Sequence, residues 1–267
     1  MEKEEHMPVK IYSFNTGLYN WRKQGNPLDG WNIVWEKLKP IAEEGAVLVL
    51  QEVLYSQEIF SAIMEDLIGY SVLFREENSR NHFVNLVVAK PGLVEDAAEA
   101  EVASGSANRF LPFRICVDGV WFNALAVHAH PLSKINNKKD ETGASEISNK
   151  LEELANLHNF IPNLVLGDFN AGKRLISADD DFIERYDKLL NDYDFKDACI
   201  DEKGTALLTH VMSSNNAAAK KEYNSIDHIL YRNRGNLKSS RASIDWCFQN
   251  DPHFDHALIC SVLSRKH

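Results

Sequence analysis

One segment of the 267-residue chain constrains its fold more than any other: residues 163–170, Asn-Leu-Val-Leu-Gly-Asp-Phe-Asn. The three consecutive apolar residues are typical of a buried strand, and Gly167 permits a tight exit from it. Side chains two positions apart on a strand point the same way, so Asp168 and Asn170 are expected to face one spot. The alternative is an ordinary turn after a strand, because Asp and Asn both favour turns.

Other apolar runs also end in polar residues. Residues 9–14 lead to Asn15, residues 46–50 lead to Glu52, and residues 120–127 lead to His128. The unbroken run at 46–50 is typical of a strand that is covered on both faces. His130 has the same strand parity as His128, and we prefer His128 because it directly follows the apolar strand.

Helices are predicted where apolar residues recur at helical spacing, in residues 31–41, 59–67, 147–158 and 182–190. Gly45 and Gly69 supply helix ends. Asp118-Gly119 between two apolar runs predicts a hairpin. The strand, helix, strand passage that leads into residues 163–170 predicts a crossover connection.

The C-terminal part contains two further Asp-His pairs. Asp227 and His228 lie in residues 223–231, whose alternation predicts a single strand, and a buried Asp there needs a hydrogen-bonding or charged partner. Asp255 and His256 precede a last predicted strand at residues 257–263.

Composition favours one globular domain over residues 1–267, with residues 1–8 as a flexible N-terminal tail. Hydrophobic residues make up 44% of the chain and charged residues 25%. The formal net charge of −10 repels polyanions at long range, so a phosphate-bearing substrate needs a bound cation or basic loops to approach. Residues 132–143 and 171–174 are the loops expected to provide such contacts.

The four cysteines lie far apart and include no Cys-x-x-Cys pair, which favours a reducing compartment. The N-terminus is charged where a signal peptide has its apolar core, and no run reaches the ~18 apolar residues of a membrane span. We therefore expect a cytoplasmic protein without stable membrane association.

Taken together, these motifs resemble the endonuclease/exonuclease/phosphatase superfamily, which includes deoxyribonuclease I. The resemblance covers essentially the whole chain, and the motifs that carry it are Ser13-Phe14-Asn15, Leu50-Gln51-Glu52, Val127-His128, Gly167-Asp168-Phe169-Asn170, Ser225-Ile226-Asp227-His228 and Phe254-Asp255-His256.

The resemblance implies a four-layer α/β sandwich, with two mixed β-sheets face to face and helices outside. It implies that Asn15 and Glu52 hold Mg²⁺ or Mn²⁺ through oxygen atoms, a ligand type that suits a hard cation, and that Asp255 adds to this site directly or through water.

The same resemblance implies the catalytic roles. Asp168 orients or deprotonates the attacking water, and Asn170 donates its amide to a phosphate oxygen. His256 contacts or protonates the phosphoryl group, Asp227 fixes the tautomer of His256, and His128 neutralises charge on phosphorus.

In one respect the sequence departs from the family pattern: Phe254 stands where the last motif usually has Ser, so a minor hydrogen bond to the site is missing or replaced. Asn85 on the predicted strand at residues 83–89, and Arg80 or His82 just before it, are further candidates for the site, and the sequence does not say which of them contributes.

The leading functional prediction is a metal-dependent phosphodiesterase that cleaves nucleic acid. The first alternative is a phosphatase or phosphodiesterase for a small or lipid phosphoester, although no exposed apolar loop for a membrane is evident. The second is a non-catalytic binding scaffold, which the complete set of polar residues disfavours. The sequence does not distinguish DNA from RNA or internal from terminal cleavage, and it does not reveal the oligomeric state.

Overall fold

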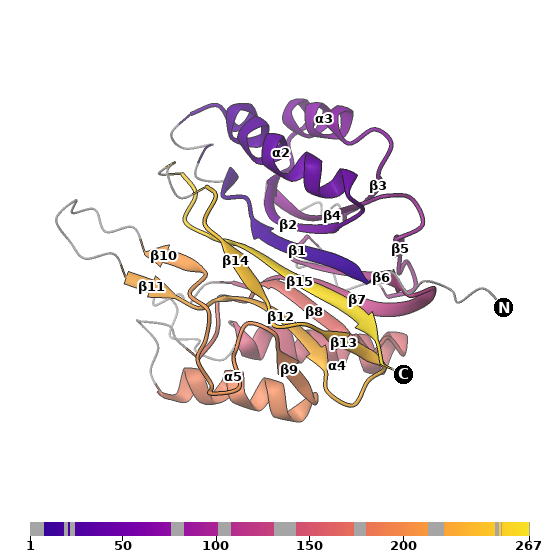
Figure 1. Ribbon diagram of the computed structural model, residues 1–267, viewed down its shortest axis with the longest axis vertical. Helices are drawn as coiled ribbons and strands as arrows, with labels where there is room; N and C mark the ends of the chain where they lie inside the picture. The colour runs from indigo at the N-terminus through magenta and orange to yellow at the C-terminus, as the bar shows by residue number, and fades with distance from the viewer. Residues whose placement is uncertain are drawn as a thin grey trace.

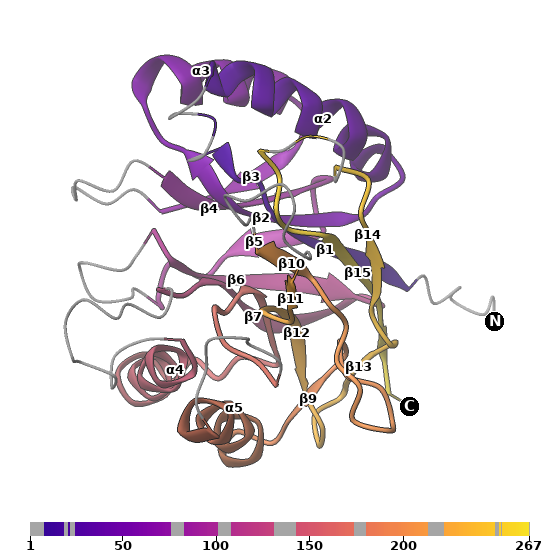
Figure 2. The same ribbon diagram turned by 90° about the vertical axis from the view of Figure 1, so that its left-hand side faces the viewer.

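Four layers, helices, sheet, sheet and helices, make up the computed structural model (Figures 1 and 2). This arrangement confirms the predicted four-layer α/β sandwich. The structure describes residues 8–18, 21, 25–75, 83–100, 108–130, 143–173, 180–212, 222–248, 251 and 253–266.

The first sheet has the strand order β13-β15-β1-β2-β4-β3, and β14 pairs with β15. Strands β1 and β2 are parallel and the other pairs are antiparallel, so the sheet is mixed. Its strands are β1 (Val9–Asn15), β2 (Val47–Leu54), β3 (Ser71–Leu73), β4 (Phe83–Ala89), β13 (Leu237–Ser239), β14 (Ser243–Asp245) and β15 (Leu258–Arg265).

The second sheet has the strand order β5-β6-β7-β8-β12-β9. Its strands are β5 (Val94–Asp96), β6 (Phe110–Val117), β7 (Val120–His128), β8 (Leu164–Asp168), β9 (Phe195–Asp197) and β12 (Asp227–Arg232). The hairpin predicted at Asp118-Gly119 joins β6 to β7, and both turn residues have positive φ. Strands β7 and β8 are parallel and are joined through α4 (Ala144–His158), which confirms the predicted crossover.

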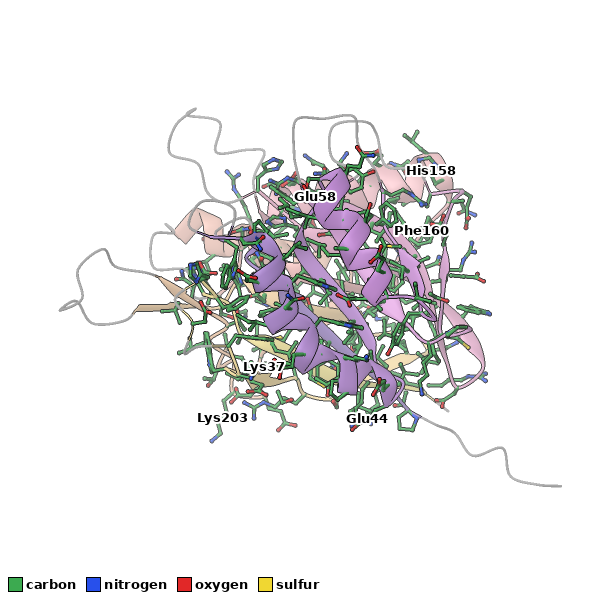
Figure 3. All side chains as sticks on the ribbon, turned by 90° about the horizontal axis from the view of Figure 1, so that it is seen from above. Lys37, Glu44, Glu58, His158, Phe160 and Lys203 are labelled. Atoms are coloured by element: carbon green, nitrogen blue, oxygen red, sulfur yellow. The ribbon has the colours of Figure 1, made fainter. Side chains whose placement is uncertain are left out.

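Apolar side chains fill the space between the sheets and the space beneath each helical layer. Every second residue of a central strand points into the space between the sheets, and Ile11, Val49 and Leu166 are examples that are fully buried there. On the outer face of the first sheet lie α2 (Pro27–Glu43) and α3 (Gln57–Asp66), and Figure 3 shows the two helices from above. On the outer face of the second sheet lie α4 and α5 (Asp180–Asp192).

The ends of α2 follow from its sequence. The side chain of Asn26 caps the helix by accepting a hydrogen bond from the backbone of Leu28, and Pro27 occupies the first turn, where a missing N–H costs nothing. Trp31 and Trp35 stack with ring centroids 5.7 Å apart, and both are buried against the first sheet.

Two predicted strands differ from the observed ones. Strand β2 does not end at Leu50 but continues to Leu54. Residues 223–231, predicted to form one strand, divide into β11 (Glu222–Asn224) and β12, because β11 pairs with β10 (His210–Met212) in a separate two-stranded sheet. Asp227 is therefore the first residue of β12 and lies at the end of a strand, not in the middle of one.

Some predictions concern segments outside the described residues: most of the tail 1–8, most of the loop 132–143, Arg80, His82 and Arg174. Residues 213–221, whose low hydrophobicity predicts a flexible connection, also lie outside them. In the described part of the chain, none of the helices combines the length and apolar character that a membrane span needs.

Candidate active site

Three neighbouring strands of the second sheet deliver polar side chains to one edge. Asp168 ends β8 and lies in register between His128 of β7 and Asp227 of β12. Gly167 makes this close approach possible: its φ is 138°, and a Cβ there would lie 1.9 Å from the carbonyl oxygen of Val127. Only glycine tolerates this position, which explains the residue before Asp168 in the motif.

Asp168 connects the two sheets. Its Oδ2 accepts a hydrogen bond from Asn15 Nδ2 of β1 at 3.0 Å, and its Oδ1 accepts one from the backbone of Asn170 at 2.9 Å. Burial raises the pKa of Asp168, and the charge of Asp227 raises it further, while His256 and the two hydrogen bonds oppose the shift. The carboxyl is thus held in a fixed orientation with an increased affinity for a proton.

Glu52 enters the site through a β-bulge in β2. The pairing with β4 shifts register between Leu50 and Val53, and Glu52 adopts a φ of 54°, a left-handed conformation that is uncommon for Glu. Burial raises the pKa of Glu52 to about 7, with His256 opposing the shift and Asp168 and Asp255 adding to it. The charges of Glu52, His256, Asp168 and Asp255 therefore influence one another.

The two candidate histidines face different surroundings. His128 is buried, with its Nε2 3.4 Å from Glu52 Oε1 and 4.0 Å from Asp168 Oδ2. His130 instead lies against α4, where its Nδ1 is 2.9 Å from Glu146 Oε1. The structure therefore brings His128, and not His130, to the edge that holds Asp168.

Burial and the nearby Arg109 guanidinium hold the pKa of His128 well below its usual range, so the ring is neutral near pH 7. Its Nδ1 has no hydrogen-bond partner among the described residues, which favours the tautomer with the proton on Nε2. His128 is consequently a hydrogen-bond donor to the site. The sequence suggested that it neutralises charge there, and a neutral ring does not do so.

His256 is held by Asp227. Its Nδ1 lies 3.0 Å from both carboxylate oxygens of Asp227, and its Nε2 points toward Asp168 Oδ2 at 3.9 Å. Burial lowers the pKa of His256, but Asp227, Asp168 and Asp255 outweigh burial and raise it well above the usual value. His256 is therefore an imidazolium with one N–H directed into the site.

Thr209 and His210 support this cluster and were missed in the sequence. Thr209 Oγ1 accepts hydrogen bonds from the backbone of Ile226 and Asp227, and His210 Nε2 lies 3.7 Å from Asp255 Oδ2. The only signal in the sequence is a Thr-His pair, because β10 is too short to show a strand pattern.

Asp255 lies at the rim of the cluster, and its side chain is 32% exposed. Burial raises its pKa, but His210 and His256 outweigh burial and lower it below the usual value. Asn170, the last of the predicted residues, donates its Nδ2 to the carbonyl of Ala129 at 2.9 Å. All eight predicted site residues thus lie at the joint edge of the two sheets.

The donor set of this edge fits a divalent cation. Carboxylates from Glu52, Asp168 and Asp255 gather there, and burial raises the pKa of Glu52 and of Asp168. Asn15 Oδ1, which accepts a hydrogen bond from the backbone of Gly17, keeps a second lone pair for a ligand role. Oxygen ligands of this kind suit Mg²⁺ or Mn²⁺.

His228, adjacent to Asp227, points to the opposite side of the strand and belongs to a different network. It is fully buried, with Nδ1 2.8 Å from Asp197 Oδ2 and Nε2 2.8 Å from the carbonyl of Ala171. Tyr186 Oη donates to the same Asp197 oxygen at 2.9 Å. Burial lowers the pKa of His228, but Asp197 and the two hydrogen bonds outweigh it and raise the pKa. Both ring nitrogens face acceptors, so His228 is an imidazolium.

Phe254 replaces the expected Ser with a core contact. It is buried against Phe14, Phe248 and Trp21, with ring centroids 6.1, 5.1 and 6.2 Å away. The aromatic ring therefore anchors the segment before Asp255 and His256 by packing, where a hydroxyl would use a hydrogen bond.

Solved structures with the same fold are numerous. The catalytic domain of human Nocturnin is 15% identical, with 97% of this chain and 94% of that chain covered and a TM-score of 0.64. An AP endonuclease from Leishmania major is 13% identical, with 97% and 88% covered and a TM-score of 0.67. A 3′-5′ exonuclease from Neisseria meningitidis is 18% identical, with 97% and 100% covered and a TM-score of 0.60.

No protein-family model and no curated protein matches the sequence. At identities this low, the likeness to solved structures establishes the fold. The chain therefore has the deoxyribonuclease I-like fold of the endonuclease/exonuclease/phosphatase superfamily, as its sequence motifs predicted.

Proposed function

We propose that this protein is a divalent-metal-dependent phosphodiesterase that cleaves nucleic acid by in-line attack of water. The observation that carries the proposal is the cluster at the joint edge of the two sheets, where a buried Asp168 lies beside the Asp227–His256 pair, His128 and Glu52. The cluster supplies a base, a cationic donor and oxygen ligands, and it needs no nucleophilic Ser or Cys.

Asp168 is the group that orients and deprotonates the attacking water. A general base works best when its pKa approaches the working pH, and burial moves the pKa of Asp168 in that direction. Asn15 and Asn170 hold one carboxylate oxygen each, so the lone pairs that remain point in fixed directions.

His256 stabilises the negative charge that develops on the phosphoryl oxygens. Asp227 holds the ring and keeps it protonated, so the Nε2–H is available as a charged hydrogen-bond donor. His128 adds a neutral donor from the neighbouring strand, and the second hydrogen of Asn170 Nδ2 is positioned on the same edge. These donors are fixed before the substrate arrives, which lowers the cost of reorganisation.

Glu52, Asn15 and Asp255 are the residues that would hold Mg²⁺ or Mn²⁺. A bound cation polarises the phosphate and stabilises charge on the leaving oxygen. It would also favour the ionised forms of Glu52 and Asp168, whose pKa values are raised by burial and, to a smaller extent, by repulsion from neighbouring carboxylates.

Nucleic acid is the substrate class that the comparisons support. The solved structures with this fold include an AP endonuclease, a 3′-5′ exonuclease and a protein complexed with a single-stranded DNA product. With a net charge of −10, the protein has to approach a polyanion through local contacts and a bound cation, and not through its overall field.

The test is hydrolysis of labelled single-stranded DNA, double-stranded DNA, RNA and a phosphoinositide, with Mg²⁺, with Mn²⁺ and with EDTA. We expect metal-dependent cleavage of a polynucleotide. Asp168→Asn and His256→Gln should each lower kcat by about 10²- to 10⁴-fold, because each removes a group that acts on a proton or a charge in the transition state. His130→Ala is the matched control and should change the rate less than about threefold, since His130 contacts Glu146 outside the cluster.

Activity on the phosphoinositide alone would replace the nuclease with a phosphatase of the same chemistry. Equal rates for the wild type and the Asp168→Asn variant would exclude the assigned base. Absence of hydrolysis of all four substrates at every metal concentration would favour a binding scaffold.

A further inference from the structure

His210 lies at the rim of the cluster and has no role in the proposed hydrolysis. Its position is fixed by backbone pairing: His210 and His256 form an antiparallel bridge, and the backbone of Val211 donates to the carbonyl of Asp255 at 2.7 Å. The backbone of Ala257 donates to the carbonyl of Thr209 at 2.7 Å. The segments 209–211 and 255–257 are thus held side by side.

This pairing sets two imidazoles around one carboxylate. His210 Nε2 lies 3.7 Å from Asp255 Oδ2, and His256 Nε2 lies 3.8 Å from Asp255 Oδ1. The ligand atoms of all three residues lie within 4.8 Å of one another, which is compatible with three ligands of one ion. The side chains of His210 and Asp255 are 18% and 32% exposed, so an ion can enter from solvent.

His256 has an outer partner of the kind that metal-bound histidines use. Asp227 holds His256 through Nδ1 and leaves Nε2 directed toward Asp255. A carboxylate on the remote ring nitrogen fixes the ring and strengthens the nitrogen that binds the metal. At His210 the side-chain Nδ2 of Asn224 lies 3.4 Å from Nδ1 and orients the ring.

We propose that His210, Asp255 and His256 form a binding site for a transition-metal cation such as Zn²⁺, and that filling it inhibits the enzyme. Two imidazoles and one carboxylate are a common three-ligand set for zinc, with a water molecule completing the tetrahedron. Nitrogen ligands favour zinc over Mg²⁺, which prefers oxygen. The site therefore differs in metal preference from the oxygen ligands of Glu52 and Asn15.

The inhibition follows from the two shared residues and rests on the proposed function. A cation on His256 Nε2 removes the N–H that would contact the phosphoryl group, and it engages Asp255 at the same time. The proposed activity then requires this site to be empty of zinc while the oxygen site is filled.

A second cluster with metal-binding residue types illustrates what such a site needs. The ligand atoms of Asp197, Cys199 and His228 also lie within 4.8 Å of one another. However, both ring nitrogens of His228 are already hydrogen-bonded, and burial raises the pKa of the Cys199 thiol well above its ordinary value, with Asp197 adding to the shift. His210 and Asp255 differ from this cluster because both side chains are partly exposed to solvent.

Calorimetric titration of the metal-free protein with Zn²⁺ tests the site without any substrate. We expect one zinc ion per chain in the wild type. His210→Phe keeps an aromatic ring but removes the ligand nitrogen, and it should weaken the affinity for zinc by at least about tenfold, since even outer-shell changes cost 10- to 100-fold. Asp255→Asn is a second variant with the same expected direction, and His130→Ala is a control that should bind as the wild type does.

The activity arm uses saturating Mg²⁺ and increasing Zn²⁺. The zinc concentration for half-inhibition should rise by at least about tenfold in His210→Phe relative to the wild type. Zinc affinity equal to that of the wild type in both variants, or no zinc binding by the wild type, would overturn the site. Binding that depends on His210 without inhibition would overturn the inhibitory role. If the wild type hydrolyses no substrate, the proposed function fails, and the calorimetry alone decides the site.

Discussion

Replacement of His228 by Ala tests the buried network that supports the candidate site, without removing any residue proposed to take part in the reaction. His228 has no role of its own in the proposed reaction, but its Nε2 donates to the carbonyl of Ala171, directly after Asn170. Gly172 leaves room for this contact, since a Cβ there would lie 2.8 Å from His228 Nε2 and 2.0 Å from the carbonyl oxygen of Ser225. The substitution removes both the cation that faces Asp197 and the donor to Ala171.

The expected loss of stability is large because it leaves a buried charge without its partner. Asp197 and His228 have side chains 1% and 0% exposed, and breaking such a pair from one side typically costs about 3–5 kcal/mol. In the variant, Tyr186 still donates a hydrogen bond to Asp197, so we expect a loss of stability near the lower end of this range. For a chain of this size, the loss corresponds to a fall in Tm of about 6–20 °C.

Urea denaturation followed by circular dichroism measures the effect, with His158→Ala as a control at a partly exposed histidine that ends α4. The control should lie within about 0.5 kcal/mol of the wild type. The double variant His228→Ala/Asp197→Ala should lose less stability than the two single losses combined, because it leaves neither charge unpaired.

The pH dependence has a definite sign. The folded-state pKa of His228 is raised, so its contribution to stability is fully present below the unfolded value of ~6.5 and is lost as the pH rises through the folded pKa. The stability difference between the wild type and His228→Ala should therefore be largest near pH 6 and should shrink at higher pH. A loss below about 1 kcal/mol at pH 6, or a difference that grows with pH, would refute the assignment of a buried imidazolium.

Three further outcomes are expected. Glu52→Gln should stabilise the protein in EDTA at pH 8 by roughly 1–3 kcal/mol and should have little effect at pH 5. The reason is that the pKa of Glu52 is raised to about 7, so that its ionisation at pH 8 opposes folding. Equal urea midpoints of the variant and the wild type at pH 8 would contradict this. Phe254→Ser, which restores the residue usual in the family, should lower the free energy of unfolding by about 3–5 kcal/mol through loss of the contacts with Phe14 and Phe248, and a stabilised variant in thermal melts would count against it. Gly167→Ala should give little folded protein on size-exclusion chromatography, since its Cβ would clash with the carbonyl of Val127. A normal monomer peak with native circular dichroism would show that β7 and β8 can move apart enough to accommodate the Cβ.

Long apolar runs with clear ends made much of the fold predictable. β1, β4, β7 and β8 were each predicted to within a few residues, because a run of five or more buried residues bounded by turn signals has few alternatives. Three-residue strands such as β9 and β13 were not predicted. Such short segments carry no period, and they become strands only because a longer neighbour offers its backbone.

The residue types of the site were predictable, but their surroundings were not. Asp168 and Asn170 could be recognised because they follow a buried strand. The bulge that turns Glu52 inward depends on the register with β4, and the contact of His210 with Asp255 depends on pairing between segments far apart in the sequence. The neutral state of His128 depends on burial near Arg109, which no local pattern encodes.

The pairing of β1 with β15 has a consequence for synthesis of the protein on the ribosome. The first strand of this sequence lies antiparallel to the last, with Tyr12 opposite Cys260, and β2 joins β1 on its other side. Strand β1 therefore lacks one of its two neighbours until the segment 255–265 has emerged, so completion of this sheet depends on pairing between strands far apart in the sequence. The same segment carries Asp255 and His256. A nascent chain surrounded by ribosomal RNA thus lacks two residues of the proposed active site until residues 255 and 256 have been translated.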